Sequence, residues 1–221
     1  MFSLYVIVDR GVFATAGEWL AALAEVARVT MNRPGVGFQV RVKGLAAEKR
    51  AALTAGARQA LREHAQRAIL NGSVDEALAA GFGGTHWPEA DIPDAAPRVP
   101  AGFVLGASVH SLEALRRAES AGAHFALFGP VFDAGSKPAR GVGREALREV
   151  AKAARIPVLA VGGITPGRAA SCIEAGAAGV AAVTGVLHAP DAGRAITHYV
   201  DACHRAGDTT RQQPRPSLPI H

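Results

Sequence analysis

The sequence predicts an α/β fold: a single (β/α)8 barrel of the TIM type, with eight strands that are each followed by a helix or loop. Short apolar runs recur along the chain, and segments with apolar residues at helical spacing lie between most of them. The length of 221 residues falls in the range of roughly 200–250 that one α/β barrel occupies. The alternative, an open doubly wound sheet, would be favoured by Gly-x-Gly-x-x-Gly after the first strand, and that motif is absent.

The expected elements follow from these runs and from local capping signals. Strands are expected at 4–8, 36–43, 67–70, 83–86, 103–105, 125–128, 157–161 and 179–183. Helices are expected at 18–30, 46–64, 73–80, 143–155, 165–175 and 191–204, and one capped by Ser111 is expected between the fifth and sixth strands. Ser73 and Glu76 predict a capping box, and Thr165 with Pro166 predicts an N-cap followed by proline in the first helical position. Residues 1–206 are expected to form the barrel, and the Pro- and Arg-rich residues 207–221 a disordered tail.

Composition limits the kind of partner. The net charge of +5 comes from scattered arginines with no basic cluster, which argues against a nucleic-acid binder and suits an anionic small molecule. The two cysteines lack metal-ligand spacing, so a reducing, cytoplasmic location is expected. The first residues lack the basic region of a signal peptide, and no apolar run approaches the roughly 20 residues that span a bilayer. Association into a homo-oligomer is compatible with the sequence.

Glycine-containing loops follow the last two predicted strands, at Gly162-Gly163-Ile164 and Thr184-Gly185-Val186. Barrels often bind phosphate at these loops, because glycine lets the backbone approach and N–H groups at a helix start face the anion. The alternative is that the glycines only form tight turns. Since both loops carry the signal, we expect phosphate to bind at Gly162, Gly163, Val183 and Thr184.

Several polar side chains fall where parallel strands end, which is the ligand-binding end of such barrels. His110 follows the fifth strand and could exchange a proton near neutral pH, although a solvent-exposed or packed histidine is an equal alternative. His86 is a rival, but its neighbours Trp87 and Pro88 suggest packing. Lys137 could pair with phosphate or carboxylate, the alternative being a solvated lysine.

The second strand alternates, with Gln39, Arg41 and Lys43 on one face. In a small barrel one face of each strand points inward, and its last positions reach the ligand end. We therefore expect these three polar side chains to lie toward a site; the alternative is a solvated face.

The motifs GASVHSLEALRRAESAGAHFALFGPVFDAGSKP, IPVLAVGGITP, AGAAGVAAVTGV and FQVRVK resemble the thiamine phosphate synthase/TenI superfamily. The similarity extends to about residue 187 and is most specific in the second half. The resemblance implies a (β/α)8 barrel that binds thiazole phosphate at the loops after strands seven and eight.

The superfamily includes two activities. The synthase joins a pyrimidine pyrophosphate to thiazole phosphate with Mg²⁺ and carries Asn-Asp-Arg after strand three, where this chain has Asn71-Gly72-Ser73. The second metal-side carboxylate remains as Asp91. The TenI branch, which is similar at Ser-Val-His-Ser and Ser-Lys-Pro, includes thiazole tautomerases that aromatise carboxythiazole phosphate by proton transfer without a metal. In that branch the histidine matching His110 is the acid/base.

The sequence thus favours a thiazole tautomerase of thiamine biosynthesis acting on a phosphorylated thiazole, with neither cofactor nor metal ligands. The first alternative is a thiamine phosphate synthase with an altered metal site, which would require Mg²⁺. The second is a non-catalytic, regulatory barrel that binds a thiamine-related phosphate. Trp87 and Pro88 are expected to reshape the pocket. His110 and Lys137 are the expected catalytic residues, and the expected substrate-binding residues are Gln39, Arg41, Lys43, Asn71, Ser108 and Ser136.

Overall fold

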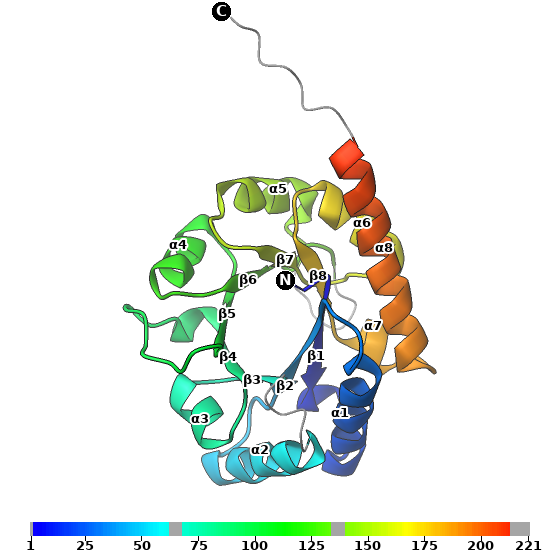
Figure 1. Cartoon of the computed structure of the whole chain (residues 1–221). Coiled ribbons are helices and arrows are strands. Elements are labelled where there is room, and N and C mark those ends of the chain that lie inside the picture. Colours follow the sequence, from blue (N-terminus) through cyan, green and yellow to red (C-terminus); the bar gives the residue numbers. More distant parts are fainter. Residues whose placement is uncertain (1, 62–67, 134–139, 213–221) are drawn as a thin grey trace, which may run out of the picture.

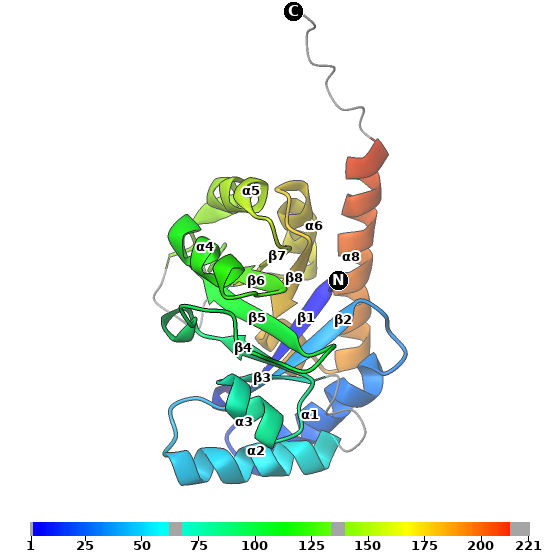
Figure 2. The same cartoon turned by 60° about the vertical axis from the view of Figure 1, so that its left-hand side comes forward.

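Eight parallel strands close into a barrel in the order of the sequence, with β8 paired to β1 (Figure 1). The structure, a computed structural model, describes residues 2–61, 68–133 and 140–212. The strands form the inner ring and the helices surround it, which is the predicted (β/α)8 TIM barrel (Figure 2). Lys137 and Ser136 lie outside the described residues.

The elements agree with the predicted ones to within a few residues at most ends. The strands are β1 Leu4–Asp9, β2 Val36–Arg41, β3 Ala68–Asn71, β4 Gly84–Trp87, β5 Val104–Val109, β6 Phe125–Phe128, β7 Val158–Ala160 and β8 Gly179–Ala182. The α-helices are α1 Ala16–Thr30, α2 Ala47–Leu61, α3 Val74–Ala79, α4 Leu112–Ser120, α5 Gly143–Ala153, α6 Pro166–Glu174, α7 Thr184–Leu187 and α8 Ala192–Gln212. Short 3-10 turns are η1 Arg10–Val12 and η3 Glu89–Asp91.

The final helix is longer than expected. α8 continues through Gln212, so the chain does not become irregular at Gly207 as the sequence analysis expected. A single glycine costs a helix only about 1 kcal/mol, and the first proline after α8 begins is Pro214. The proposed tail beyond Gln212, residues 213–221, lies outside the described residues.

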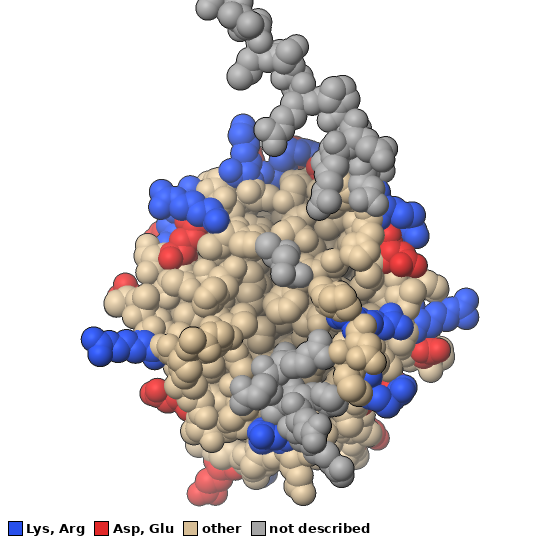
Figure 3. Space-filling view, in the orientation of Figure 1, with Lys and Arg blue, Asp and Glu red and all other residues tan. Residues whose placement is uncertain are grey.

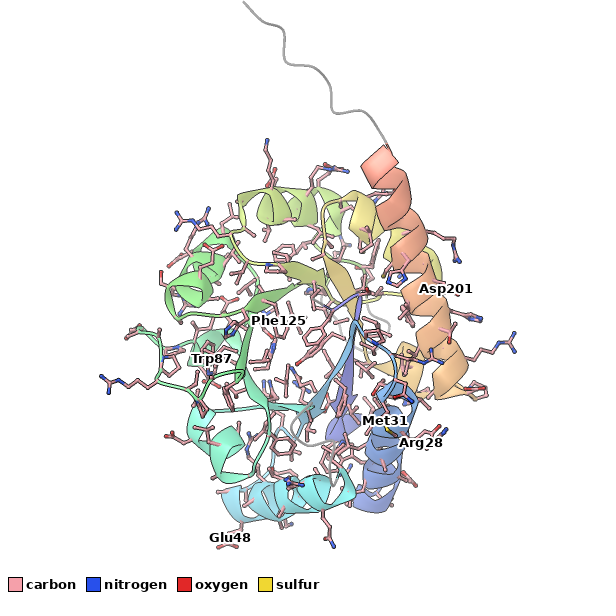
Figure 4. The ribbon with its side chains drawn as sticks, viewed as in Figure 1. Arg28, Met31, Glu48, Trp87, Phe125 and Asp201 are labelled. Carbon is pink, nitrogen blue, oxygen red and sulfur yellow. The ribbon has the colours of Figure 1, made fainter. Side chains whose placement is uncertain are left out.

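The barrel interior is filled mainly by aromatic and aliphatic side chains. Tyr5 and Phe125 lie 5.2 Å apart between ring centroids at 67°, and Phe2 packs edge-on against Phe125 at 5.5 Å. Figure 4 shows Phe125 within the ring of strands. A Cβ at Gly106 would lie 2.5 Å from the Phe125 ring, so glycine on β5 makes room for this stack. The barrel interior near the N-terminal ends of the strands is thus a packed core. A ligand must therefore bind at the C-terminal ends of the strands.

The larger core lies between the strands and the helices. Trp19 of α1 is fully buried and its Nε1–H donates to the carbonyl of Val8 at 3.1 Å, which fixes α1 to β1. Cys172 and Cys203 are both buried, and burial raises the pKa of these thiols to about 12 and about 11. Cys172 is therefore a core residue, and its thiol stays protonated at neutral pH.

The surface carries charges of both signs. On the face shown in Figure 3, Lys and Arg lie close to Asp and Glu around the edge, while the centre is largely uncharged. Among the described residues, no helix is both long enough and apolar enough to cross a membrane.

Candidate active site at the C-terminal end of the barrel

The C-terminal ends of β1 and β2 bring together two charged side chains. Asp9 and Arg41 are register partners in the sheet, and their side chains form an ion pair between an Arg41 Nη and Asp9 Oδ2. The other Asp9 oxygen accepts the Gly11 N–H at 3.0 Å. Arg41 therefore lies at the C-terminal end of the barrel, as expected. The carboxylate of Asp9, which was not among the residues predicted from the sequence, holds it there.

Gln39 lies one layer deeper than Arg41. It is buried, and its Nε2 is 3.5 Å from the Tyr5 hydroxyl, which is buried as well. Burial raises the pKa of Tyr5, so the phenol stays protonated. Gln39 thus faces the barrel interior, as the alternating pattern of the second strand predicted, but its hydrogen-bond partner Tyr5 belongs to the packed layer.

His86 and Ser108 face each other across β4 and β5. His86 Nε2 is 2.9 Å from Ser108 Oγ, and the ring is 1% exposed with Nδ1 lacking a hydrogen-bond partner. Desolvation, with a smaller effect from the charge of Arg41, lowers the pKa of His86 to about 3. His86 is therefore a neutral, packed histidine, and its contact with Ser108 orients a residue that the sequence predicts to bind substrate.

Because His86 stays neutral when folded, stability should fall in mild acid. The unfolded histidine, with its ordinary pKa of 6.5, takes up a proton below that pH, whereas the folded one does so only near its pKa of about 3. The stabilising contribution is therefore present above pH 6.5 and lost as pH falls, by about 2 kcal/mol between pH 7.5 and 5. Urea unfolding of wild type, His86→Gln and the exposed control His198→Gln at both pH values checks this. Equal losses in wild type and His86→Gln would show that another group is responsible.

His110 follows β5 and is held from two sides. Its backbone N–H donates to Glu89 Oε2 at 2.6 Å, and its Nδ1 contacts the carbonyl of Gly129 at the end of β6. A carbonyl only accepts, so Nδ1 carries the proton and Nε2 is the basic nitrogen of the neutral ring. The side chain is exposed. The structure thus gives His110 a defined tautomer suited to proton transfer through Nε2.

The loop after β6 packs tightly on the loop after β7. Gly162 has φ +93° and Gly163 φ +61°, conformations that favour glycine, and a Cβ on Gly162 would lie 2.5 Å from Pro130. The Phe132 N–H donates to the Gly162 carbonyl at 3.1 Å. His110, the β6 loop and the β7 glycines are therefore connected at the same end of the barrel.

The β8 loop joins them through α8. Tyr199 donates its hydroxyl hydrogen to the Ile164 carbonyl at 2.8 Å, and a Cβ at Gly185 would lie 2.2 Å from that same hydroxyl. Thr184 begins the short α7, and Val183 is the residue just before it. One buried tyrosine thus ties together the two loops for which the sequence predicts phosphate binding.

A cavity of about 630 Å³ opens beside the ends of β2, β3 and β4. Basic, acidic and apolar side chains all line it. The lining residues are Lys43, Arg50, Asn71, Gly72, Ser73, Val74, Asp75, Glu76, Trp87, Pro88, Asp91, Pro93, Pro97 and Arg98. Two predicted substrate-binding residues, Lys43 and Asn71, are among them. Trp87 and Pro88 form part of the wall, as the sequence analysis expected, and Figure 4 shows Trp87 beside β4.

Arg50 is one of two arginines of this cavity that sequence reasoning missed, and Arg98 is the other. Arg50 lies on α2, and its guanidinium donates to the carbonyls of Val42 and Asn71 and to the carboxylate of Glu76. Asn71 in turn donates its Nδ2–H to the carbonyl of His86 at 3.2 Å. Nothing in the Ala- and Arg-rich sequence of α2 separates Arg50 from the other arginines of that segment.

A family model described as thiamine monophosphate synthase matches residues 4–186, a range that spans all eight strands. The chain belongs to this family. It is the thiamine phosphate synthase/TenI superfamily that the motifs resemble, so that prediction is confirmed. The match ends before α8, which packs against α6, α1 and β1 on the outside of the barrel.

Curated relatives agree with the family. The chain is 42% identical over 173 residues to the thiamine biosynthesis bifunctional protein ThiM/ThiE of Symbiobacterium thermophilum, covering 76% of this chain but only 36% of that protein. It is 38% identical to the thiamine-phosphate synthase of Roseiflexus sp. RS-1, covering 85% of this chain and 79% of the relative. These names favour the transferase, which the sequence analysis gave as an alternative, over the isomerase that it placed first.

A solved structure also agrees. Thiamine phosphate pyrophosphorylase from Pyrococcus furiosus superposes with a TM-score of 0.69 at 28% identity, over 93% of this chain and 96% of that one. A further barrel, KGPDC from Streptococcus mutans, reaches a TM-score of 0.68 at 13% identity, which supports the fold alone.

For a synthase the resemblance implies Mg²⁺, and the residues here do not fit a divalent ion at the end of β3. Gly72 supplies no carboxylate, and the nearby carboxylate of Glu76 is bound by the Arg50 guanidinium. Among the described residues, no group of three or more His, Cys, Asp or Glu could hold a metal. Asp91 lines the same cavity, but a cationic guanidinium beside Gly72 repels a second cation.

Proposed function

We propose that this chain is a transferase of thiamine biosynthesis that joins a pyrimidine pyrophosphate to a thiazole phosphate and releases pyrophosphate. The proposal is supported by the family membership and by relatives at 31–38% identity that are called thiamine-phosphate synthases. The single structural observation that supports it is that a cavity lined by Lys43, Arg50 and Arg98 and the glycine loops after β7 and β8 lie at the same end of the barrel. This arrangement suits two phosphorylated substrates better than one.

The first place is the cavity beside β2–β4, where three cationic side chains, Lys43, Arg50 and Arg98, are within reach of a diphosphate. A pyrophosphate leaving group accumulates negative charge as it departs, and fixed positive charges stabilise that charge in the transition state. The carboxylates of the same cavity make it mixed in charge, so a diphosphate has to bind on its cationic side.

The second place is formed by the glycine loops after β7 and β8. Gly162, Gly163 and Thr184 can present backbone N–H groups to the phosphate of a thiazole. Ser108 and His110 lie at the C-terminal end of β5, which stands between the cavity strands β2–β4 and the strands β7 and β8 in the strand order. The two substrates would then meet over the centre of the barrel, which positions them for reaction.

Incubating the protein with the pyrimidine pyrophosphate and the thiazole phosphate tests this proposal. We expect thiamine phosphate and pyrophosphate to appear in equal amounts. Lys43→Met should slow formation at least tenfold, because it removes a charge that the departing diphosphate needs. Lys152→Met on the outer helix α5 is the matched control. If Lys43→Met were as active as the control, the diphosphate would not bind in this cavity.

A thiazole tautomerase is the second candidate, and two observations favour it. His110 has its proton on Nδ1 and its lone pair on Nε2, and the end of β3 lacks the carboxylate of the synthase motif. In this reading the ring moves one proton on carboxythiazole phosphate, while Lys137 and Arg41 hold its carboxylate. Conversion of that compound to its aromatic isomer by the protein alone would support this candidate.

A further inference from the structure

Gly72, at the end of β3, leaves space that the ends of two long side chains occupy. A Cβ built there would lie 2.5 Å from Arg50 Nη2 and 2.5 Å from Glu76 Oε2, closer than real Cβ atoms come to other atoms. Its φ is not in the left-handed region, so the backbone does not demand glycine. Any side chain at this position must displace the ion pair of Arg50 and Glu76, and this pair therefore occupies the volume of a residue-72 side chain.

The pair is held firmly. Arg50 Nε donates to Glu76 Oε1 at 2.8 Å, and Nη2 donates to Glu76 Oε2 at 3.1 Å and to the Asn71 carbonyl at 2.8 Å. Nη1 donates to the Val42 carbonyl. Glu76 Oε2 also accepts the Ser73 N–H at 3.0 Å, as part of the capping box of α3. The guanidinium is therefore fixed to the ends of two neighbouring strands and to α3.

Arg50 lines the cavity and keeps one N–H donor unused by the described residues. A guanidinium has five N–H bonds, and the contacts within the described part of the chain use four of them, leaving one on Nη1. The Arg50 side chain is only 21% exposed yet lines the 630 Å³ cavity together with Lys43 and Asn71. A half-buried, preorganised cation is a stronger anion ligand than a solvated one, because solvent screens it less and little entropy is lost on binding.

We propose that Arg50, positioned by Glu76 and admitted by Gly72, binds the diphosphate directly at the end of β3, where it replaces a carboxylate-held divalent cation. This inference rests on the proposed transferase function. Its consequence is that diphosphate binding here does not depend on a divalent cation. The charge that stabilises the anion is then built into the protein and is present before any substrate arrives.

Binding of inorganic pyrophosphate, measured by calorimetry in EDTA and in excess Mg²⁺, tests the inference. Wild type should bind in EDTA, with an affinity that Mg²⁺ does not improve. Arg50→Gln should bind about 10- to 100-fold more weakly, the loss of a charge-assisted hydrogen bond. The control Arg148→Gln, which breaks the exposed pair with Glu145 on α5, removes the same charge and should bind like wild type.

Gly72→Ala tests the position of the Arg50 guanidinium without changing any charge. It keeps both charged residues but pushes the guanidinium out of place, so pyrophosphate binding should weaken several-fold while the net charge is unchanged. Glu76→Gln keeps a neutral partner for Arg50 and removes its counter-charge, so binding should tighten. If the anion did not contact Arg50, Gly72→Ala would leave pyrophosphate binding unchanged. Circular dichroism of each variant checks that it is folded.

Three results would overturn the inference. Wild type that binds pyrophosphate only in Mg²⁺ would show that a metal is needed after all. Unchanged pyrophosphate binding by Arg50→Gln would show that the anion lies elsewhere. No pyrophosphate binding by wild type in either buffer would show that the cavity is not a diphosphate site. Thiamine phosphate formation by the same wild-type preparation reports on the proposed function separately, so either claim can fail without the other.

Discussion

Gly162→Val is expected to lose thiazole phosphate binding by at least tenfold and to destabilise the barrel. Gly162 has φ +93°, which costs a side-chain-bearing residue about 1–2 kcal/mol, and its Cβ would lie 2.5 Å from Pro130. Overpacking of this kind costs about 1–3 kcal/mol more, so the two effects together amount to roughly 2–5 kcal/mol. Urea unfolding and calorimetric titration with thiazole phosphate measure both losses.

A glycine that makes no close contact serves as the control. Gly167 lies in the first turn of α6, and within the described part of the chain a Cβ there would approach only Thr165 Oγ1, at 4.0 Å. Gly167→Ala should therefore leave phosphate binding unchanged and stabilise the protein slightly, since alanine favours a helix. Wild-type binding by Gly162→Val would mean that the β7 loop does not contact the phosphate.

His110→Asn is expected to separate the two candidate reactions. Asparagine can keep an N–H donor near the position of Nδ1, and so the contact with the Gly129 carbonyl, but it has no counterpart to Nε2. Proton transfer by the ring should then be lost, which lowers tautomerase activity about 10²–10⁴-fold. Thiamine phosphate formation needs no proton from this ring in our account and should fall less than tenfold.

The two rates are measured on one preparation, with carboxythiazole phosphate in one assay and both transferase substrates in the other. His188→Asn, an exposed histidine after α7, controls for general effects of the substitution. If tautomerase activity is present in wild type and survives in His110→Asn, the histidine is not its acid/base. A large loss of transferase activity would require a role for His110 that our account lacks.

Much of the barrel end could be predicted from the sequence, because strand patterns have a physical period of two. The alternation at Gln39 and Arg41 predicted that both side chains face inward, and the sheet register places Arg41 beside Asp9. The tight loop after β7 could also be predicted from its two glycines, since glycine is the residue that adopts positive φ most easily. His86 was expected to pack, and its burial with a lowered pKa agrees.

Other features depend on long-range packing that no local pattern encodes. Arg50 reaches Asn71 and Glu76, 21 and 26 residues further along the chain, and nothing in α2 marks it out. The sequence shows that Gly72 replaces an aspartate of the family motif, but only the structure shows which atoms fill the space. The tautomer of His110 depends on a carbonyl 19 residues away, at Gly129. The ranking of isomerase above transferase relied on short motifs, and the relatives do not support it.

The central claim is that this barrel makes thiamine phosphate with a diphosphate site charged by Arg50. The most direct measurement is thiamine phosphate formation from the pyrimidine pyrophosphate and thiazole phosphate, followed in EDTA and in Mg²⁺ for wild type and Arg50→Gln. Our account predicts product from wild type in both buffers and a rate at least tenfold lower for Arg50→Gln. No thiamine phosphate in either buffer, with conversion of carboxythiazole phosphate to its aromatic isomer by the same preparation, would contradict it.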